Sequence, residues 1–106
     1  MTVPKLNLVE VLVLSKVIER HGTGPNHAGL DCNIHYQSAA GWAMSRLRAL
    51  ETKGLVVQRG PGDTYFTATQ AGLAAYEAYR PALEAAGDWL PMRGIFRDAQ
   101  GVERKP

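Results

Sequence analysis

The sequence has 106 residues, of which 45% are hydrophobic and 21% charged, a balance typical of one globular domain and not of a disordered chain. The formal net charge of +2 is mildly basic and says little by itself about an anionic partner. A single cysteine, Cys32, excludes an intrachain disulfide, and the apolar run at residues 8–14 is too short to span a membrane, so we expect a cytoplasmic protein without a membrane partner.

The first predicted element is a helix over residues 7–20. Asn7 can cap it, Glu10 stands at the reciprocal position of a capping box, and Gly22 supplies a stop. Its apolar residues cover most of the circumference, so the helix should be buried on more than one side, with the second face against another subunit. Its β-branched residues leave a strand as the alternative.

The helical pattern breaks down over residues 21–33. Gly22, Gly24 and Pro25 indicate a loop, and Gly29 weakens any helix that comes after them. We expect at most one or two helical turns, around residues 27–31.

A second long helix is predicted over residues 36–53, with Gly54 as its stop. One stripe of it is apolar: Tyr36, Ala39, Ala40, Ala43, Leu47 and Leu50. The opposite face is small, polar and basic: Gln37, Ser38, Gly41, Trp42, Ser45, Arg48, Ala49 and Thr52. Arg46 lies at the flank of the apolar stripe.

Positive charge concentrates in the same part of the chain. Between residues 35 and 60, one acidic residue, Glu51, stands against four basic ones: Arg46, Arg48, Lys53 and Arg59. An anionic ligand would therefore be attracted to the middle third of the sequence.

Residues 55–59 and 64–68 are predicted to pair as a β-hairpin, because Gly60, Pro61 and Gly62 form a dense turn signal between them. Arg59 is expected near its tip. Thr69 can cap a further helix, which Pro81 should kink or divide before Gly87. A small C-terminal hairpin is expected after this helix, with residues 102–106 frayed.

The segment 44–56, which reads MSRLRALETKGLV, resembles the end of the recognition helix and the first wing strand of winged-helix repressors. The segment 67–73, TATQAGL, resembles the strand end and helix start that come after their wing. The order is similar to that of the MarR and PadR regulator families over residues 36–80. Two features differ from those families: residues 22–33 replace the helix before the recognition helix, and Arg59 is the only basic residue of the wing.

The resemblance implies a mainly α fold with a small β-hairpin wing, a dimeric α+β winged helix-turn-helix. Its domain would span residues 1–90, with the recognition helix at 36–53, the wing at 55–68 and a C-terminal extension at 91–106. In such proteins the recognition helix enters the major groove of duplex DNA and the wing meets the backbone.

The DNA-binding residues expected on this basis combine donors for base edges with cations for phosphates. They are Gln37, Ser38, Gly41, Trp42, Ser45, Arg46, Arg48, Lys53 and Arg59. Gly41 would allow close approach of the backbone. Trp42 has three readings: stacking on the nucleic acid, packing on the C-terminal tail, or anchoring a protein partner.

Neither a metal site nor a catalytic site is expected. His27, Cys32 and His35 match no standard zinc spacing, and no group is identified that would orient Cys32 with His35 for nucleophilic attack. We therefore predict no enzyme activity, metal or cofactor.

Three functions fit these features. The first is a homodimeric transcription regulator that reads duplex DNA with the 36–53 helix and a 59–64 wing. The main alternative is a winged-helix module that binds protein, such as a complex subunit or a small inhibitor encoded by a mobile element. A third is an architectural DNA binder with little sequence preference.

Overall fold

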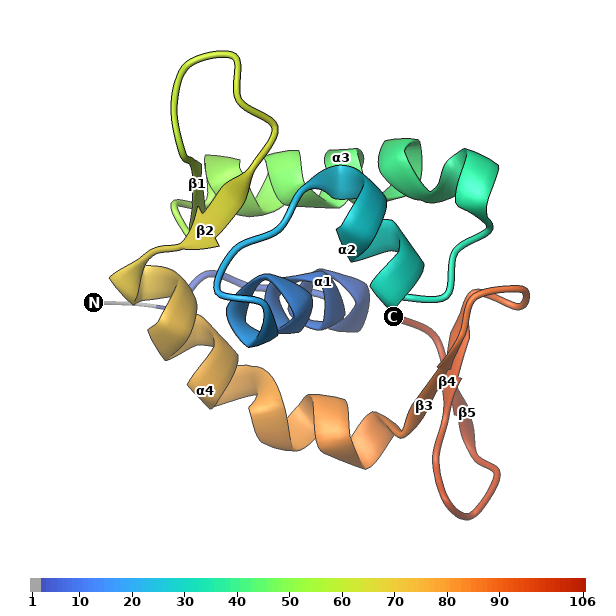
Figure 1. Ribbon diagram of the computed structural model, residues 1–106. Coiled ribbons are helices and arrows are strands. Elements are labelled where there is room, and N and C mark those ends of the chain that lie inside the picture. The colour runs from blue at the N-terminus through green and yellow to red at the C-terminus, as the bar shows by residue number, and fades with distance from the viewer. Residues whose placement is uncertain (1–2) are drawn as a thin grey trace.

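Helix α1 (Leu8–Glu19) lies at the centre of the molecule (Figure 1), in a computed structural model that describes residues 3–106. Its N-terminus is the predicted capping box. The Asn7 side chain accepts a hydrogen bond from the Glu10 N–H at 2.8 Å, and the Glu10 carboxylate accepts one from the Asn7 N–H at 3.0 Å. The helix is confirmed, and the strand alternative is wrong.

The apolar residues of α1 are covered within one chain. Helix α3 (Tyr36–Thr52), helix α4 (Gln70–Ala86) and strand β2 (Phe66–Ala68) all contact it. Five of its apolar side chains are at most 5% exposed: Val9, Val11, Val13, Leu14 and Val17. Elements of the same chain therefore pack on α1 from several sides and bury these residues without another subunit, and the predicted contact with a second subunit stays a prediction.

Helix α2 (Pro25–Asp31) occupies the segment that was expected to be mostly loop. The low helix propensity of Gly29 disfavours a helix here, but the packing of α2 against α3 requires a glycine at this position. A Cβ atom on Gly29 would lie 2.3 Å from the carbonyl oxygen of Ala39 on α3, so only glycine lets the two helices cross this closely. A turn with Asn33 in the left-handed region (φ 59°) then leads into α3.

Helix α3 buries most of the predicted stripe, with Ala39, Ala43, Leu47 and Leu50 at most 1% exposed. Tyr36 departs from the prediction, because its side chain is 76% exposed. It stands in the first turn of α3, where the helix extends beyond the core.

The predicted hairpin is present. Strand β1 (Val56–Gln58) pairs antiparallel with β2, with Val57 opposite Thr67. Thr23 forms an isolated bridge with Phe66 on the other edge of β2. The backbone of Arg59 still donates to the Tyr65 carbonyl at 2.8 Å, so Arg59 lies at the base of the loop and not near its tip.

Helix α4 runs through Pro81 without interruption, so the predicted division at this residue is wrong. Pro81 is exposed, and the carbonyl that its missing N–H leaves unpaired can be solvated. Thr69 caps α4 as predicted, accepting a hydrogen bond from the Gly72 N–H at 3.0 Å.

The C-terminal part forms a three-stranded antiparallel sheet, β3 (Asp88–Leu90), β4 (Ile95–Arg97) and β5 (Glu103–Arg104), in the order β3-β4-β5. The hairpin expectation is confirmed for β3 and β4. The prediction that residues 102–106 are frayed is wrong for Glu103 and Arg104, because they form β5 and pair with β4. The boundary expected at residue 91 falls in the turn between β3 and β4, and Phe96 beyond it is fully buried.

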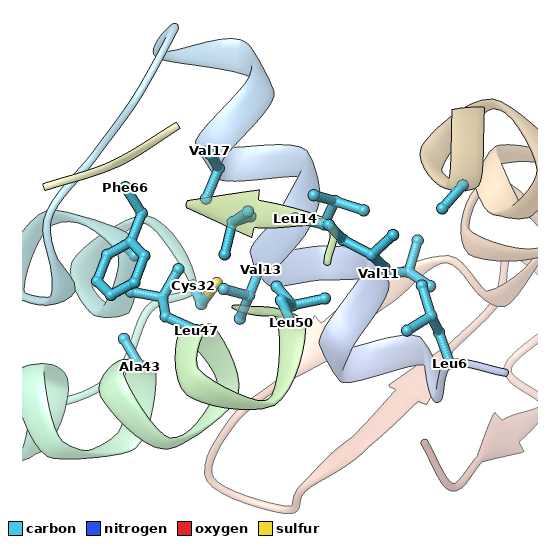
Figure 2. Close-up of a cluster of buried hydrophobic side chains, with 14 residues drawn as sticks. Leu6, Val11, Val13, Leu14, Val17, Cys32, Ala43, Leu47, Leu50 and Phe66 are labelled. Atoms are coloured by element: carbon cyan, nitrogen blue, oxygen red, sulfur yellow. The ribbon is translucent and has the colours of Figure 1, made fainter. Parts of the chain in front are cut away.

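The core joins α1 to α3 and to β2. Figure 2 shows Val13 of α1 beside Leu47 and Leu50 of α3 in this cluster of buried side chains. Cys32 belongs to this cluster, and burial raises the pKa of its thiol to about 12. The molecule is thus an α+β domain, and within residues 3–106 no helix has the length and apolar character to cross a membrane.

Candidate nucleic-acid interface

The exposed face of α3 is small, polar and basic, with the partly exposed Glu51 at its edge beside Arg48. Its residues recur at helical spacing and therefore share one side of the helix. All are exposed: Gln37, Ser38, Gly41, Ser45, Arg48 and Thr52. In Figure 1, α3 runs along one edge of the molecule, and the loop between β1 and β2 (residues 59–65, here called the hairpin loop) extends beyond it on the same side.

Gly41 lies near the middle of this face, and no contact inside the described chain accounts for it. A Cβ atom there would meet nothing within 4 Å. The other glycines inside helices, Gly29 and Gly72, each approach a backbone carbonyl so closely that a side chain would collide. A glycine in a helix interior costs roughly 0.8–1.0 kcal/mol relative to alanine, and at Gly41 no internal packing requires it.

Arg48 is the charged side chain of the exposed face. Its Nη1 donates to the Glu51 carboxylate at 2.9 Å, and its guanidinium lies 5.6 Å from the centre of the Phe66 ring. The two residues of this ion pair are three apart on the helix, and the arginine side chain is about half exposed. Such exposed pairs are weak, so water, a phosphate or a base edge can replace Glu51 as the partner of Arg48.

The hairpin loop is held by a local network around Asp63. The Asp63 carboxylate accepts from Arg59 Nε at 2.8 Å and from the Tyr65 N–H at 2.9 Å. The hydrogen bond from Arg59 holds the pKa of Asp63 below its usual value. Arg59 also stacks over Tyr65, with 4.5 Å between the guanidinium carbon and the ring centre.

Trp42 faces the C-terminal sheet, and Arg46 lies over its ring. Trp42 is half-buried, which corrects its placement on the outward face, and its ring centre lies 6.3 Å from that of Trp89. Arg46 covers the Trp42 ring at 4.4 Å and donates to the Trp42 carbonyl at 3.0 Å. Burial lowers the pKa of the Arg46 guanidinium. Of the three readings of Trp42, packing on the C-terminal part is the one that the structure contains.

Lys53 is engaged at the start of α1. Its Nζ lies 2.8 Å from the Glu10 carboxylate and 3.1 Å from the Lys5 carbonyl oxygen. The structure therefore brings together Gln37, Ser38, Gly41, Ser45 and Arg48 on one face, with Arg59 on the neighbouring loop, and places Trp42, Arg46 and Lys53 at the flank of α3.

A polar cleft beside the hairpin loop was not predicted from the sequence. Arg20 and His27 reach it from the stretch 20–27 and Tyr65 from the hairpin loop, and no local motif signals the proximity of these two stretches. His27, Cys32 and His35 do not gather with other potential ligands, since no cluster of three or more histidine, cysteine or acidic side chains suited to a metal ion occurs between residues 3 and 106.

Comparison of the chain with protein-family models, with curated proteins and with solved structures gives no match. We therefore infer the function from the geometry and chemistry of this molecule.

Proposed function

We propose that the chain is a winged helix-turn-helix protein that binds duplex DNA and regulates transcription in the cytoplasm. In this assignment α2 and α3 form the helix-turn-helix, α3 is the recognition helix, and the hairpin loop is the wing. One support is the order of the elements, in which two closely crossed helices precede a β-hairpin. The other is that α3 and the hairpin loop lie on the same side of the molecule (Figure 1).

The observation that carries the proposal is Gly41 at the middle of the exposed face of α3, where a side chain would meet nothing within 4 Å. A residue that weakens a helix and has no internal packing role is explained when a partner must approach the helix backbone closely. The side chains around it are short hydroxyls, an amide and one guanidinium, which suit the edges of base pairs in a major groove. The acidic side chain at the edge of this face, Glu51, is paired with Arg48.

We further propose that the functional unit is a homodimer. One copy offers Arg48 and Arg59 toward the DNA, and each has an acidic neighbour. So few cations give one copy a weak electrostatic attraction to the backbone. Two copies on adjacent half-sites double the number of contacts and add sequence length to the recognised site.

Gly41→Ala tests the proposal through two effects of opposite sign. The substitution should raise the free energy of unfolding by about 1 kcal/mol, because alanine favours the helix and the added methyl meets nothing. It should also weaken DNA binding by about tenfold, since the methyl keeps the backbone away from the groove. Urea unfolding and fluorescence anisotropy measure the two quantities.

Ala78→Gly is the matched control, since Ala78 is exposed on α4. It should lower the free energy of unfolding by about 1 kcal/mol and leave DNA binding unchanged. A Gly41→Ala protein that is more stable and binds DNA as tightly as the wild type would contradict the proposed role of α3.

A protein-binding function is the second candidate, and the ion pairs favour it. Arg48, Arg59 and Lys53 each have an acidic partner within 2.9 Å, which leaves the interface with little free positive charge. In that case the same face of α3 would receive a protein backbone, and Gly41→Ala would weaken the protein complex while no DNA binding is measurable.

A further inference from the structure

A cleft of about 490 Å³ lies between the hairpin loop and the segment that joins α1 to α2. This volume falls within the range of small-molecule sites, about 300–1,000 Å³. One wall is the stretch from the end of α1 to the start of α2, residues 20–27, and the other is the hairpin loop, more than 30 residues later in the sequence. The lining is mainly polar: Arg20, Gly22, Thr23, Gly24, His27, Arg59, Asp63, Thr64 and Tyr65.

Arg20 brings positive charge to one wall of the cleft, and its counter-charge lies outside the lining. Its Nε and Nη2 donate to the carboxylate of Asp31, the second at 2.9 Å. Asp31 does not line the cleft. This arrangement fixes the guanidinium in place and leaves its Nη1 without an acceptor among residues 3–106.

Asp63 is the acidic residue of the lining, and its charge is already compensated. One oxygen accepts from Arg59 Nε and the other from the Tyr65 N–H. Arg59 uses only Nε in this pair, so within the described chain both of its terminal nitrogens keep their hydrogen-bonding capacity. Guanidinium groups with free terminal nitrogens bind phosphate oxygens in a defined geometry.

The two walls are fastened to each other before any ligand binds. A Cβ atom on Gly22 would lie 2.5 Å from the Tyr65 ring, so the ring packs directly over this glycine. Thr23 and Phe66 exchange two backbone hydrogen bonds, at 2.9 and 2.8 Å. The basic groups of the cleft therefore line a site that is formed before a ligand binds, which reduces the entropy lost on binding.

We propose that this cleft binds a phosphate group through Arg20, His27 and Arg59, with the Thr64 hydroxyl as a further donor. The phosphate belongs either to the backbone of the bound duplex or to a free phosphorylated ligand. The first source rests on the proposed function, because it requires DNA on α3. The second does not depend on it.

The first experiment is an NMR titration of the ¹⁵N-labelled protein with inorganic phosphate, compared with chloride at equal ionic strength. The amides of Gly22, Gly24 and Tyr65 should shift saturably with phosphate only. Arg20→Gln and His27→Gln should each reduce this response. His27 is exposed, so its replacement keeps the test valid if loss of the Arg20–Asp31 pair disturbs the fold.

The second experiment measures DNA affinity against salt concentration for the same variants. Arg80→Gln is the matched control, because Arg80 is a half-exposed arginine on α4 with two glutamate neighbours and no place in the cleft. If a backbone phosphate enters the cleft, Arg20→Gln should reduce the slope of log K against log salt by about 0.9. The control should not change it.

The outcomes separate the two sources. A reduced slope supports a DNA phosphate, and saturable phosphate shifts with an unchanged slope support a free phosphorylated ligand. If neither response occurs, the cleft is not a phosphate site. If the wild type binds no DNA at all, the proposed function fails, and the phosphate titration alone decides for or against the cleft.

Discussion

Trp89 shows how one side chain links the C-terminal sheet to the rest of the molecule. Its ring centre lies 5.0 Å from that of Phe96 and 6.3 Å from that of Trp42. Its indole Nε1, however, is buried and has no hydrogen-bond acceptor among residues 3–106. The ring therefore stabilises the contact by its area, while the N–H loses the hydrogen bond that it would make in water.

Trp89→Phe should accordingly leave the free energy of unfolding unchanged or raise it by about 1 kcal/mol, since it removes an unpaired buried donor and keeps an aromatic ring. Trp89→Ala should lower it by about 3 kcal/mol, because the ring is lost. Urea unfolding curves of both variants measure the difference. Equal losses in the two variants would show that the N–H has a partner in solution.

At the scale of elements, the contact between α2 and α3 depends on Gly29. The opposing atoms belong to the backbone of Ala39, and a backbone cannot move aside as a flexible side chain can. Glycine therefore has different structural roles in these two neighbouring helices. Gly29 is required for packing within the molecule, whereas Gly41 faces solvent and a side chain there would contact nothing.

Gly29→Ala should destabilise the protein by about 2 kcal/mol, because forcing α2 and α3 apart outweighs the gain in helix propensity. Gly41→Ala, the identical substitution, is expected to stabilise it. Thermal or urea unfolding of the two variants side by side tests this contrast. A stable Gly29→Ala protein would mean that the two helices do not cross closely.

Elements with local signals were predicted correctly, and those that depend on distant contacts were not. The Asn7 capping box and the Thr69 cap involve residues three apart, so the pattern alone identified both helix starts. Helix α2 was underestimated because the packing that requires Gly29 is tertiary. Helix α4 continues through Pro81 because that residue is exposed, which no local rule reveals.

The candidate site was predicted in the same uneven way. Periodicity placed Gln37, Gly41 and Arg48 on one exposed face of α3, as the structure has them. It could not place Lys53, whose partner Glu10 lies 43 residues away. Trp42 was assigned to the outward face because the C-terminal sheet that covers it lies far along the chain from α3.

At the scale of the whole molecule, the two ends of the chain support α3 from beneath. The sheet of residues 88–104 reaches the flank of α3 through Trp42 and Trp89, and the N-terminal segment reaches it through Lys53. The opposite, exposed face of α3 remains uncovered beside the hairpin loop (Figure 1). A helix that enters a groove requires this arrangement, with a rigid support on one side and free access on the other.

The measurement that tests this account most directly is a fluorescence-anisotropy titration with random-sequence duplex DNA at two salt concentrations, for the wild type and Arg48→Ala. We predict binding that weakens as salt increases, and an affinity at least several-fold lower for Arg48→Ala with an unchanged circular-dichroism spectrum. Absence of binding at the lower salt concentration, or equal affinity of the two proteins, would contradict the assignment of α3 as a DNA-reading helix.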